Sequence, residues 1–121
     1  MKSFNKNIGY YGEEIAKDYL IKNGYKIVHR NYSNRFGEID IICKKDDILN
    51  FVEVKSRYSK NFGTGIESIT YNKVKNIKKL TKYFLLGNKY KNFFIRFDVL
   101  EVYFNTKNND YKIIFTKDAF R

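Results

Sequence analysis

The sequence contains no proline, a single cysteine and no long apolar run. Because Cys43 has no partner for an internal disulfide bond, it fits a reducing cytoplasm, and packing within a strand is its expected role. No run of about 18 apolar residues is present to cross a membrane, and the first residues lack the apolar stretch of a signal peptide. Without proline or an internal repeat, and with scattered glycines, the chain offers no linker between domains. We therefore expect a soluble, cytoplasmic protein with no membrane partner.

What the chain does have is enough length for one domain and an excess of positive charge. Its 121 residues, 43% of them hydrophobic, predict a single domain over residues 1–121 with a modest core. The 24 lysines and arginines outnumber the 13 acidic residues, which gives a net charge of +11. Such a charge favours a polyanionic partner, most simply nucleic acid. Because lysine is abundant throughout and only five basic residues are arginine, charge alone does not decide the question.

Hydrophobic periodicity predicts an α/β domain with the order α-β-β-β-α-β-β. Helices are predicted over residues 5–23, ending at Gly24, and over residues 71–86, between an N-cap at Thr70 and a stop at Gly87. The predicted strands are residues 25–32, 39–43, 48–54, 93–104 and 111–116, with loops at residues 33–36 and 58–69. This order predicts a mixed central sheet flanked by helices.

The segment from Gly37 to Arg57, GEIDIICKKDDILNFVEVKSR, places acidic residues inside apolar strands. Asp40 lies between isoleucines and Glu53 between valines, where an unpaired buried carboxylate would cost several kcal/mol. If the turn between the strands is centred on Asp46 and Asp47, Asp40 faces Glu53 directly. Something must then compensate for two opposed carboxylates.

The same register puts Glu38 opposite Lys55, and the period of two puts these four side chains on one face. Opposed side chains have Cβ atoms about 5 Å apart, so Asp40 and Glu53 would repel each other unless one is protonated or a cation lies between them. A hard divalent cation such as Mg²⁺ or Mn²⁺ prefers such oxygen ligands. The alternative is a salt-bridge ladder with Lys55 shared by Glu53 and Glu38, which leaves Asp40 without a partner.

Each predicted helix has an apolar stripe and a charged residue that departs from the pattern. Glu13 falls on the flank of the first stripe and can reach a site at the edge of the core, whereas Glu14 points toward solvent. Alternatively, both pair with surface lysines such as Lys17. Lys73 lies on the apolar side of the second helix, directed at a site or snorkelling to solvent. The first stripe is Ile8, Tyr11, Ile15, Ala16, Tyr19 and Leu20; the second is Val74, Ile77, Leu80, Phe84 and Leu85, with Lys75, Lys78, Lys79 and Lys82 on the solvated face.

Other polar residues have both structural and functional interpretations. Arg30 and Arg35 lie near the entrance to the strand of Glu38, where they can contact phosphates or form salt bridges. His29, the only histidine, is expected to be a packed or surface residue rather than a ligand. Asp98 is expected to pair with Arg96 or a lysine rather than to bind a metal.

Asp40, Glu53 and Lys55 resemble the core motif of the PD-(D/E)xK nuclease superfamily, with the acids thirteen positions apart and the lysine two positions further on. The segments GYYGEEIAKDYL, RNY, GEIDII, FVEVKSR and RFDV, together with Lys73, look more closely like the small bacterial YraN-like family, which is related to archaeal Holliday-junction resolvases. Within the G-x-x-G-E pattern the family glutamate corresponds to Glu13. Relatives often have a proline in the loop after FVEVKSR where this chain has Gly65, a difference that concerns the shape of that loop.

The resemblance implies a restriction-endonuclease-like fold and metal-dependent hydrolysis of phosphodiester bonds in DNA, leaving a 5′-phosphate, with branched or junction DNA in repair or recombination as a candidate substrate. Asp40, Glu53 and the backbone carbonyl of Val54 would bind Mg²⁺ or Mn²⁺, with Glu13 completing the set. Lys55 would orient the attacking water or neutralise the transition state, supported by Glu38. Nucleic-acid binding would fall to Lys73, Arg57, Arg35 and Arg30. The alternative is a non-catalytic nucleic-acid-binding adaptor with the same fold; a homodimer is expected by analogy with resolvases.

Overall fold

The computed structural model describes residues 2–58, 70–87, 89–108 and 110–120, with side chains from residue 8 onward. Its elements follow the predicted order: α1 (Lys2–Lys22), β1 (Lys26–Asn34), β2 (Gly37–Lys45), β3 (Ile48–Tyr58), α2 (Tyr71–Phe84), β4 (Phe94–Phe104) and β5 (Tyr111–Phe120). Of the loop predicted at residues 58–69, all but Tyr58 lies outside the described residues, and Tyr58 itself ends β3.

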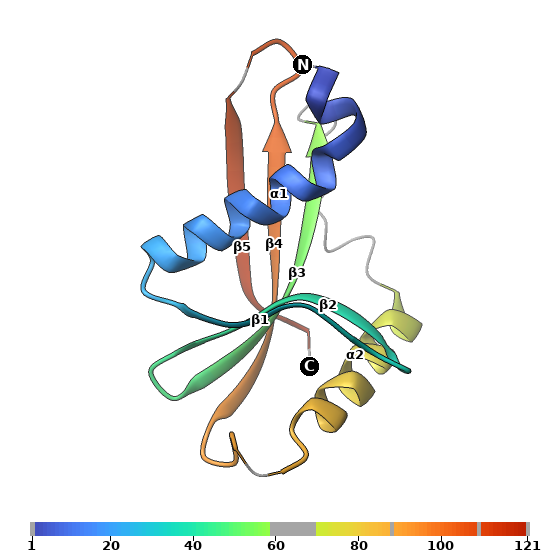
Figure 1. The fold of residues 1–121 in the computed structure, drawn as a ribbon, viewed down its shortest axis with the longest axis vertical. Coiled ribbons are helices and arrows are strands. Elements are labelled where there is room, and N and C mark those ends of the chain that lie inside the picture. The colour runs from blue at the N-terminus through green and yellow to red at the C-terminus, as the bar shows by residue number, and fades with distance from the viewer. Residues whose placement is uncertain (1, 59–69, 88, 109, 121) are drawn as a thin grey trace.

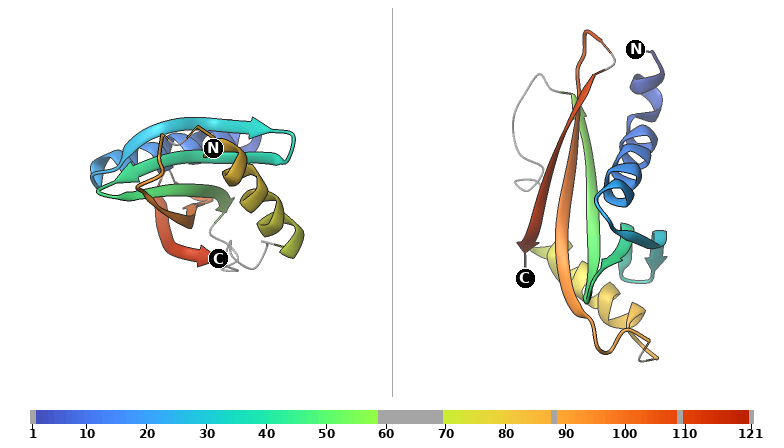
Figure 2. Two further views of the ribbon diagram at one scale, coloured as in Figure 1. Left: turned by 90° about the horizontal axis from the view of Figure 1, so that it is seen from below. Right: turned by 90° about the vertical axis from the view of Figure 1, so that its left-hand side faces the viewer.

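The described strands form one five-stranded sheet in the order β1-β2-β3-β4-β5. β3 and β4 are parallel, and each other neighbouring pair is antiparallel, so the sheet is mixed as predicted. A parallel pair needs a crossover connection, and α2 lies in the segment that joins β3 to β4. α1 runs along one side of the long strands β3 and β4, whereas α2 lies beside the β1–β2 hairpin (Figures 1 and 2).

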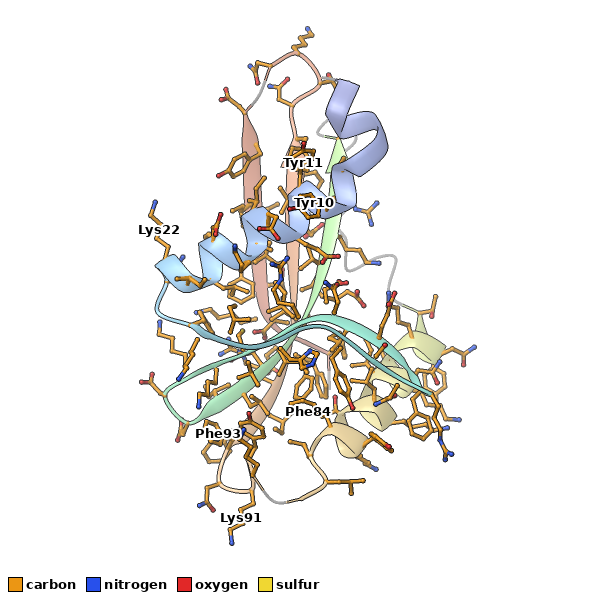
Figure 3. All side chains as sticks on the ribbon, viewed as in Figure 1. Tyr10, Tyr11, Lys22, Phe84, Lys91 and Phe93 are labelled. Atoms are coloured by element: carbon orange, nitrogen blue, oxygen red, sulfur yellow. The ribbon has the colours of Figure 1, made fainter. Side chains whose placement is uncertain are left out.

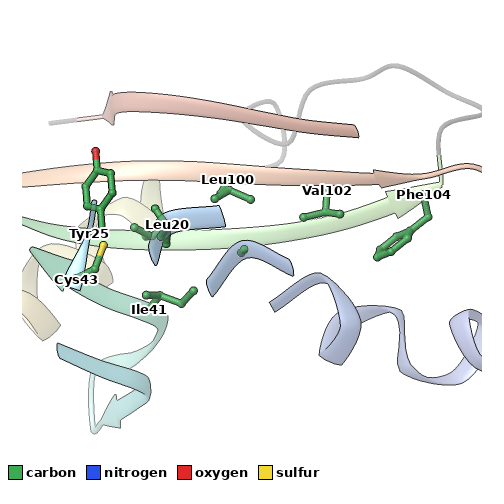
Figure 4. Close-up of a cluster of buried hydrophobic side chains, with 9 residues drawn as sticks. Leu20, Tyr25, Ile41, Cys43, Leu100, Val102 and Phe104 are labelled. Atoms are coloured by element: carbon green, nitrogen blue, oxygen red, sulfur yellow. The ribbon is translucent and has the colours of Figure 1, made fainter. Parts of the chain in front are cut away.

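The first core lies between α1 and the sheet, and it confirms the predicted stripe of the first helix. Ala16 and Leu20 are fully buried against strand residues such as Ile41, Leu100 and Val102 (Figure 4). The other four members of the stripe pack against the same cluster: Ile8, Tyr11, Ile15 and Tyr19. α1 therefore attaches to the sheet along its whole described apolar face.

The second core lies between α2 and the strands on its side of the sheet. Ile77 and Leu80 of α2 are buried with Leu49 and Phe51 of β3. Phe84 points from the end of α2 toward the strands, and its ring lies 5.7 Å from that of Phe51 (Figure 3). The N-terminus of α2 is capped as predicted, because the Thr70 side chain accepts a hydrogen bond from the backbone N–H of Lys73 at 3.1 Å.

The predicted pairing of Asp98 with Arg96 is confirmed. Arg96 donates from Nε and Nη2 to the two carboxylate oxygens of Asp98, at 2.8 and 3.0 Å. The same fully buried carboxylate accepts from Nδ2 of Asn50 at 2.8 Å and from the backbone N–H of Asp118 at 2.9 Å. Asp98 thus links β3, β4 and β5, and its oxygens are occupied by structural hydrogen bonds.

Several strands extend beyond their predicted ends, because backbone pairing continues through polar residues that resemble loop sequence. Ser33 and Asn34 pair with Glu38 and Gly37, so the loop predicted at residues 33–36 shortens to the turn at Arg35 and Phe36. β5 was predicted to end at residue 116 but continues to Phe120.

α1 approaches β3 most closely at Gly12. A Cβ atom added to this glycine would lie 1.7 Å from Oγ and 3.0 Å from Cβ of Ser56. Only a residue without a side chain fits there unless Ser56 gives way. This contact sets the distance between α1, which carries Glu13, and the strand that carries Glu53.

We expect Gly12→Ala to destabilise the fold by about 1–3 kcal/mol, because the added methyl group overlaps Ser56. The double variant Gly12→Ala with Ser56→Gly removes the overlap and should recover most of the loss in urea unfolding. Gly9→Ala, which would meet no atom within 4 Å, is the matched control on the same helix. Equal stability of the wild type and Gly12→Ala would contradict the proposed close contact.

Candidate paired-carboxylate site

The hairpin between β2 and β3 has the predicted turn and register. Asp46 and Asp47 form the turn, and Asp46 adopts a positive φ of 54°. Pairing runs from Lys45 with Ile48 up to Ile41 with Val52, in the register that would bring Asp40 opposite Glu53. The described ladder stops one pair short of these acids, so the predicted opposition of Glu38 and Lys55 is not part of it.

Beyond the last backbone pair of the ladder, the Asp40 side chain connects β2 to β3. Asp40 Oδ2 accepts a hydrogen bond from the backbone N–H of Val54 at 2.7 Å. This bond fixes the carboxylate of β2 against β3, immediately beside the strand position of Glu53. The Asp40 side chain is half-buried, and Glu53 is only 6% exposed.

The two carboxylates interact strongly. Burial raises the pKa of Asp40, and the neighbouring Glu53 raises it further through a hydrogen bond and through its charge. The hydrogen bond from the backbone of Val54 opposes this shift, but the pKa of Asp40 still reaches about 8. Without a metal ion, the pair therefore holds a proton at neutral pH, which is one of the two resolutions expected for opposed acids.

Lys73 is turned toward this pair. Its Nζ lies 2.9 Å from Glu53 Oε2, and 37% of its side chain is exposed. Burial lowers the pKa of Lys73, but the interactions with Glu53, Lys55 and Asp40 together outweigh burial and the net shift is upward. Of the two predicted orientations, the structure therefore shows the one that directs Lys73 toward the acids, while its role in binding nucleic acid stays a prediction.

Lys55 completes the group on β3. Burial lowers its pKa, and the positive charge of nearby Lys73 lowers it further, while Glu53 and Asp40 act in the opposite direction. The salt-bridge ladder considered from the sequence is not observed in this form, since it is Lys73 that forms the close ion pair with Glu53. Two carboxylates and two ammonium groups thus lie together where β2 and β3 separate.

Glu13 lies at the margin of this group. Burial raises its pKa, and the charge of Glu38 raises it further, whereas Arg30 and a hydrogen bond from Asn31 lower it. Asn31 was not among the predicted site residues, although it is the middle residue of the RNY segment that carries the family resemblance. It adopts a positive φ of 53° within β1, which asparagine tolerates better than most residues. The described residues contain no cluster of three His, Cys, Asp or Glu side chains close enough to hold a metal ion.

Glu14 differs from its prediction. Instead of pointing to solvent, it lies part-buried, with Oε2 2.6 Å from Nη2 of Arg30 and Oε1 3.2 Å from Nζ of Lys17. The pairing with Lys17 was one of the expected alternatives, but Arg30 lies on β1, so only the packing of α1 against the sheet brings it close. One end of the Arg30 guanidinium is therefore engaged by Glu14.

The remaining predicted residues are spread around this group. Glu38 is exposed on β2 and lines, with Lys73, a cavity of about 370 Å³ between α2 and the β1–β2 turn. Arg35 places its guanidinium 4.9 Å from the centre of the Phe36 ring in that turn. Arg57 is half-buried further along β3. Their assignment to phosphate contacts stays a prediction.

These features define a mixed α/β protein with a partly buried pair of carboxylates flanked by two lysines. The chain belongs to the uncharacterised protein family UPF0102, whose model matches residues 12–102. This confirms the family relationship that the YraN-like motifs indicated.

Similar proteins align with the whole length of this chain. UPF0102 proteins of Clostridium botulinum (strain Alaska E43 / Type E3) and Clostridium tetani are 53% and 50% identical over 121 residues, which is 100% of this chain and 99% of each relative. A UPF0102 protein of Clostridium perfringens (strain 13 / Type A) is 47% identical with the same coverage. Within the described part of the chain, no helix has the length and apolar character needed to span a membrane.

The raised pKa of Asp40 predicts how the stability of the fold depends on pH. Its pKa of about 8 in the folded state lies above the ordinary value of 3.8, so between these values the folded state binds more protons than the unfolded state. The stabilisation is complete below about pH 4 and is lost as the pH rises toward 8. With EDTA present, we expect the melting temperature to fall over this range and Asp40→Asn to reduce the fall.

Asp110→Asn, at an exposed turn, is the matched control and should keep the wild-type slope. Glu13 has a raised pKa and contributes in the same direction. The quantity to compare is therefore the difference in the slope of melting temperature against pH between Asp40→Asn and Asp110→Asn. An Asp40→Asn protein with an unchanged slope would show that Asp40 is ionised in the folded state at neutral pH.

Proposed function

We propose that the chain is a metal-dependent endonuclease-like protein with a restriction-endonuclease-like fold that hydrolyses phosphodiester bonds in DNA. The observation that carries the proposal is the juxtaposition of Asp40 and Glu53, with Lys55 two positions beyond Glu53 on the same strand. This is the constellation that the PD-(D/E)xK resemblance implies, and here the two acids adjoin closely enough for one to retain a proton.

The donor set fits a divalent cation. Asp40 and Glu53 provide hard oxygen ligands in a partly buried setting whose like charges require a counter-charge. Mg²⁺ commonly uses only one or two carboxylates and keeps several waters, so the absence of a third carboxylate from the described group is compatible with it. When bound, such an ion would supply a water of lowered pKa and stabilise charge on the phosphate. Glu13 and the Val54 carbonyl remain candidates for further ligands, directly or through water.

The chain's own residues would act on the phosphate around this pair. The oxygen of water forms a bond to phosphorus and the P–O3′ bond breaks, while the proton lost by water is balanced by the one gained at the 3′ oxygen. Lys55, held in a partly buried position, would neutralise the additional negative charge of the transition state. Lys73 supplies the positive charge beside Glu53 in the absence of metal. A divalent cation would replace it there and leave its ammonium group for the phosphate backbone.

A second candidate is a nucleic-acid-binding adaptor that retains the fold without turning over. The absence of a three-ligand acidic cluster among the described residues and the ion pair that engages Arg30 favour this alternative. In an adaptor, the Glu53–Lys73 pair would be a structural ion pair.

A nicking assay distinguishes the two candidates. Linear, flapped and branched DNA are incubated with the full chain and Mg²⁺ or Mn²⁺, and the products are examined for 5′-phosphate ends. We expect cleavage that EDTA abolishes, that Asp40→Asn eliminates, and that Lys55→Ala slows by about 100-fold or more, because it removes a fixed charge at the transition state.

Lys22→Ala and Asp110→Asn, both at exposed positions, remove one charge each and should retain wild-type cleavage. Cleavage that persists in Asp40→Asn or in EDTA would overturn the proposed site. DNA binding without cleavage, insensitive to metal and to both site variants, would support the adaptor.

A further inference from the structure

The outer side of α2 and Phe36 of the β1–β2 turn line a shallow, solvent-open pocket that includes neither carboxylate. Its volume is about 340 Å³, and it is lined by Phe36, Lys79, Lys82, Tyr83 and Leu86. We call it the α2 pocket. Its lining combines apolar and aromatic groups with lysines and includes no acidic residue.

Tyr83 and Leu86 of the α2 pocket are accessible, whereas Phe36 is part-buried. Tyr83 is 50% exposed and Leu86 is 73% exposed. The rings of Phe36 and Tyr83 have centroids 6.4 Å apart and are inclined at 63°, and the guanidinium of Arg35 lies over the Phe36 ring. An accessible tyrosine beside a part-buried phenylalanine, with three cationic side chains around them, forms a surface suited to a flat, electron-rich, negatively charged ligand.

The positive charge of α2 has no acidic residue near it in the sequence. From Thr70 to Phe97 the sequence contains no acidic residue, whereas α2 alone carries five lysines. A helix face that is merely solvated commonly mixes acidic and basic residues at i, i+4 spacing, which this sequence cannot do. The surplus of positive charge around the α2 pocket therefore complements a polyanion.

The α2 pocket lies next to the cavity between α2 and the β1–β2 turn. Phe36 lines both this pocket and the 370 Å³ cavity that contains Lys73, whose Nζ contacts Glu53. Lys73 and Tyr83 are ten residues apart on α2, which corresponds to about 15 Å along the helix. A strand whose phosphate lies at the carboxylates can therefore reach the pocket within a few nucleotides.

We propose that the α2 pocket binds an unpaired base of a nucleic-acid strand, stacked on Tyr83 with its edge toward Phe36, and with Lys79 and Lys82 at its phosphates. This inference rests on the proposed function in taking nucleic acid as the ligand, and it adds the substrate class. Within a duplex both faces of each base are covered by its neighbours, so only an unpaired nucleotide can place its base in the pocket. The site then selects DNA that has unpaired nucleotides a few positions from the scissile phosphate, such as an overhang or a flap.

Binding measurements test the proposal independently of cleavage. The full chain carrying Asp40→Asn, in EDTA, is titrated against a fluorescent duplex with a three-nucleotide overhang and against a blunt duplex of equal charge. We expect Tyr83→Ala to weaken overhang binding about 10-fold and blunt-duplex binding by less than twofold. Tyr111→Ala is the matched control, because Tyr111 is 52% exposed on β5 and also adjoins one aromatic ring, that of Phe104.

A fluorescence measurement reports stacking directly. The chain has no tryptophan, so Tyr83→Trp introduces a single indole at the pocket. Its emission should be quenched by the overhang duplex but not by the same duplex with abasic overhang positions. Tyr111→Trp should respond to neither.

Three outcomes would overturn the inference: no binding of the chain to any of these DNAs, an equal effect of Tyr83→Ala on both duplexes, or quenching that persists with abasic overhangs. A loss of self-association in Tyr83→Ala, seen by sedimentation without an effect on DNA, would assign the pocket to a second copy of the chain and would also overturn it. If cleavage fails but the Tyr83 dependence holds, the proposed enzymatic function fails and the base-binding pocket stands.

Discussion

The conflict between two carboxylates in an apolar hairpin is the constraint on which the site depends. Asp40 and Glu53 lie side by side where β2 and β3 separate, and burial together with the interaction with Glu53 raises the pKa of Asp40 to about 8. The hydrogen bond from Val54 holds Asp40 in this position, and Lys73 supplies part of the missing positive charge. A fold selected for stability alone would be served better by apolar residues at these two positions.

The fold places a residue from each helix near the two carboxylates. The parallel pairing of β3 with β4 requires a crossover, and this crossover contains α2. The packing of α2 against the strands in the second core directs Lys73 toward Glu53. On the other side, the close contact between Gly12 and Ser56 brings α1 onto β3, so that Glu13 approaches the same strands. The lysines of α2 extend the positive charge beside the site along the helix toward Tyr83.

Local periodicity was sufficient to predict the order of elements, the stripe of α1, the turn at Asp46 and the inward orientation of Lys73. These features depend on repeat lengths of 2 and 3.6 residues, which can be read along the chain. The pairing of Glu14 with Arg30 depends instead on where α1 crosses β1, which no local pattern contains. The end of β5 was missed for a similar reason, because contacts distant in sequence hold it. The backbone N–H of Asp118 donates to the Asp98 carboxylate, and the ring of Phe120 stacks on that of Phe97.

The most direct test of the central claim is calorimetric titration of the full chain with Mn²⁺, in two buffers of different ionisation enthalpy. The account predicts one binding site that both Asp40→Asn and Glu53→Gln remove. It also predicts that binding near pH 7 releases a proton, because a ligand carboxyl must be deprotonated before it can coordinate the metal. Binding that is unchanged in both variants, or wild-type protein that binds no Mn²⁺, would contradict the claim that this pair of acids is a cation site.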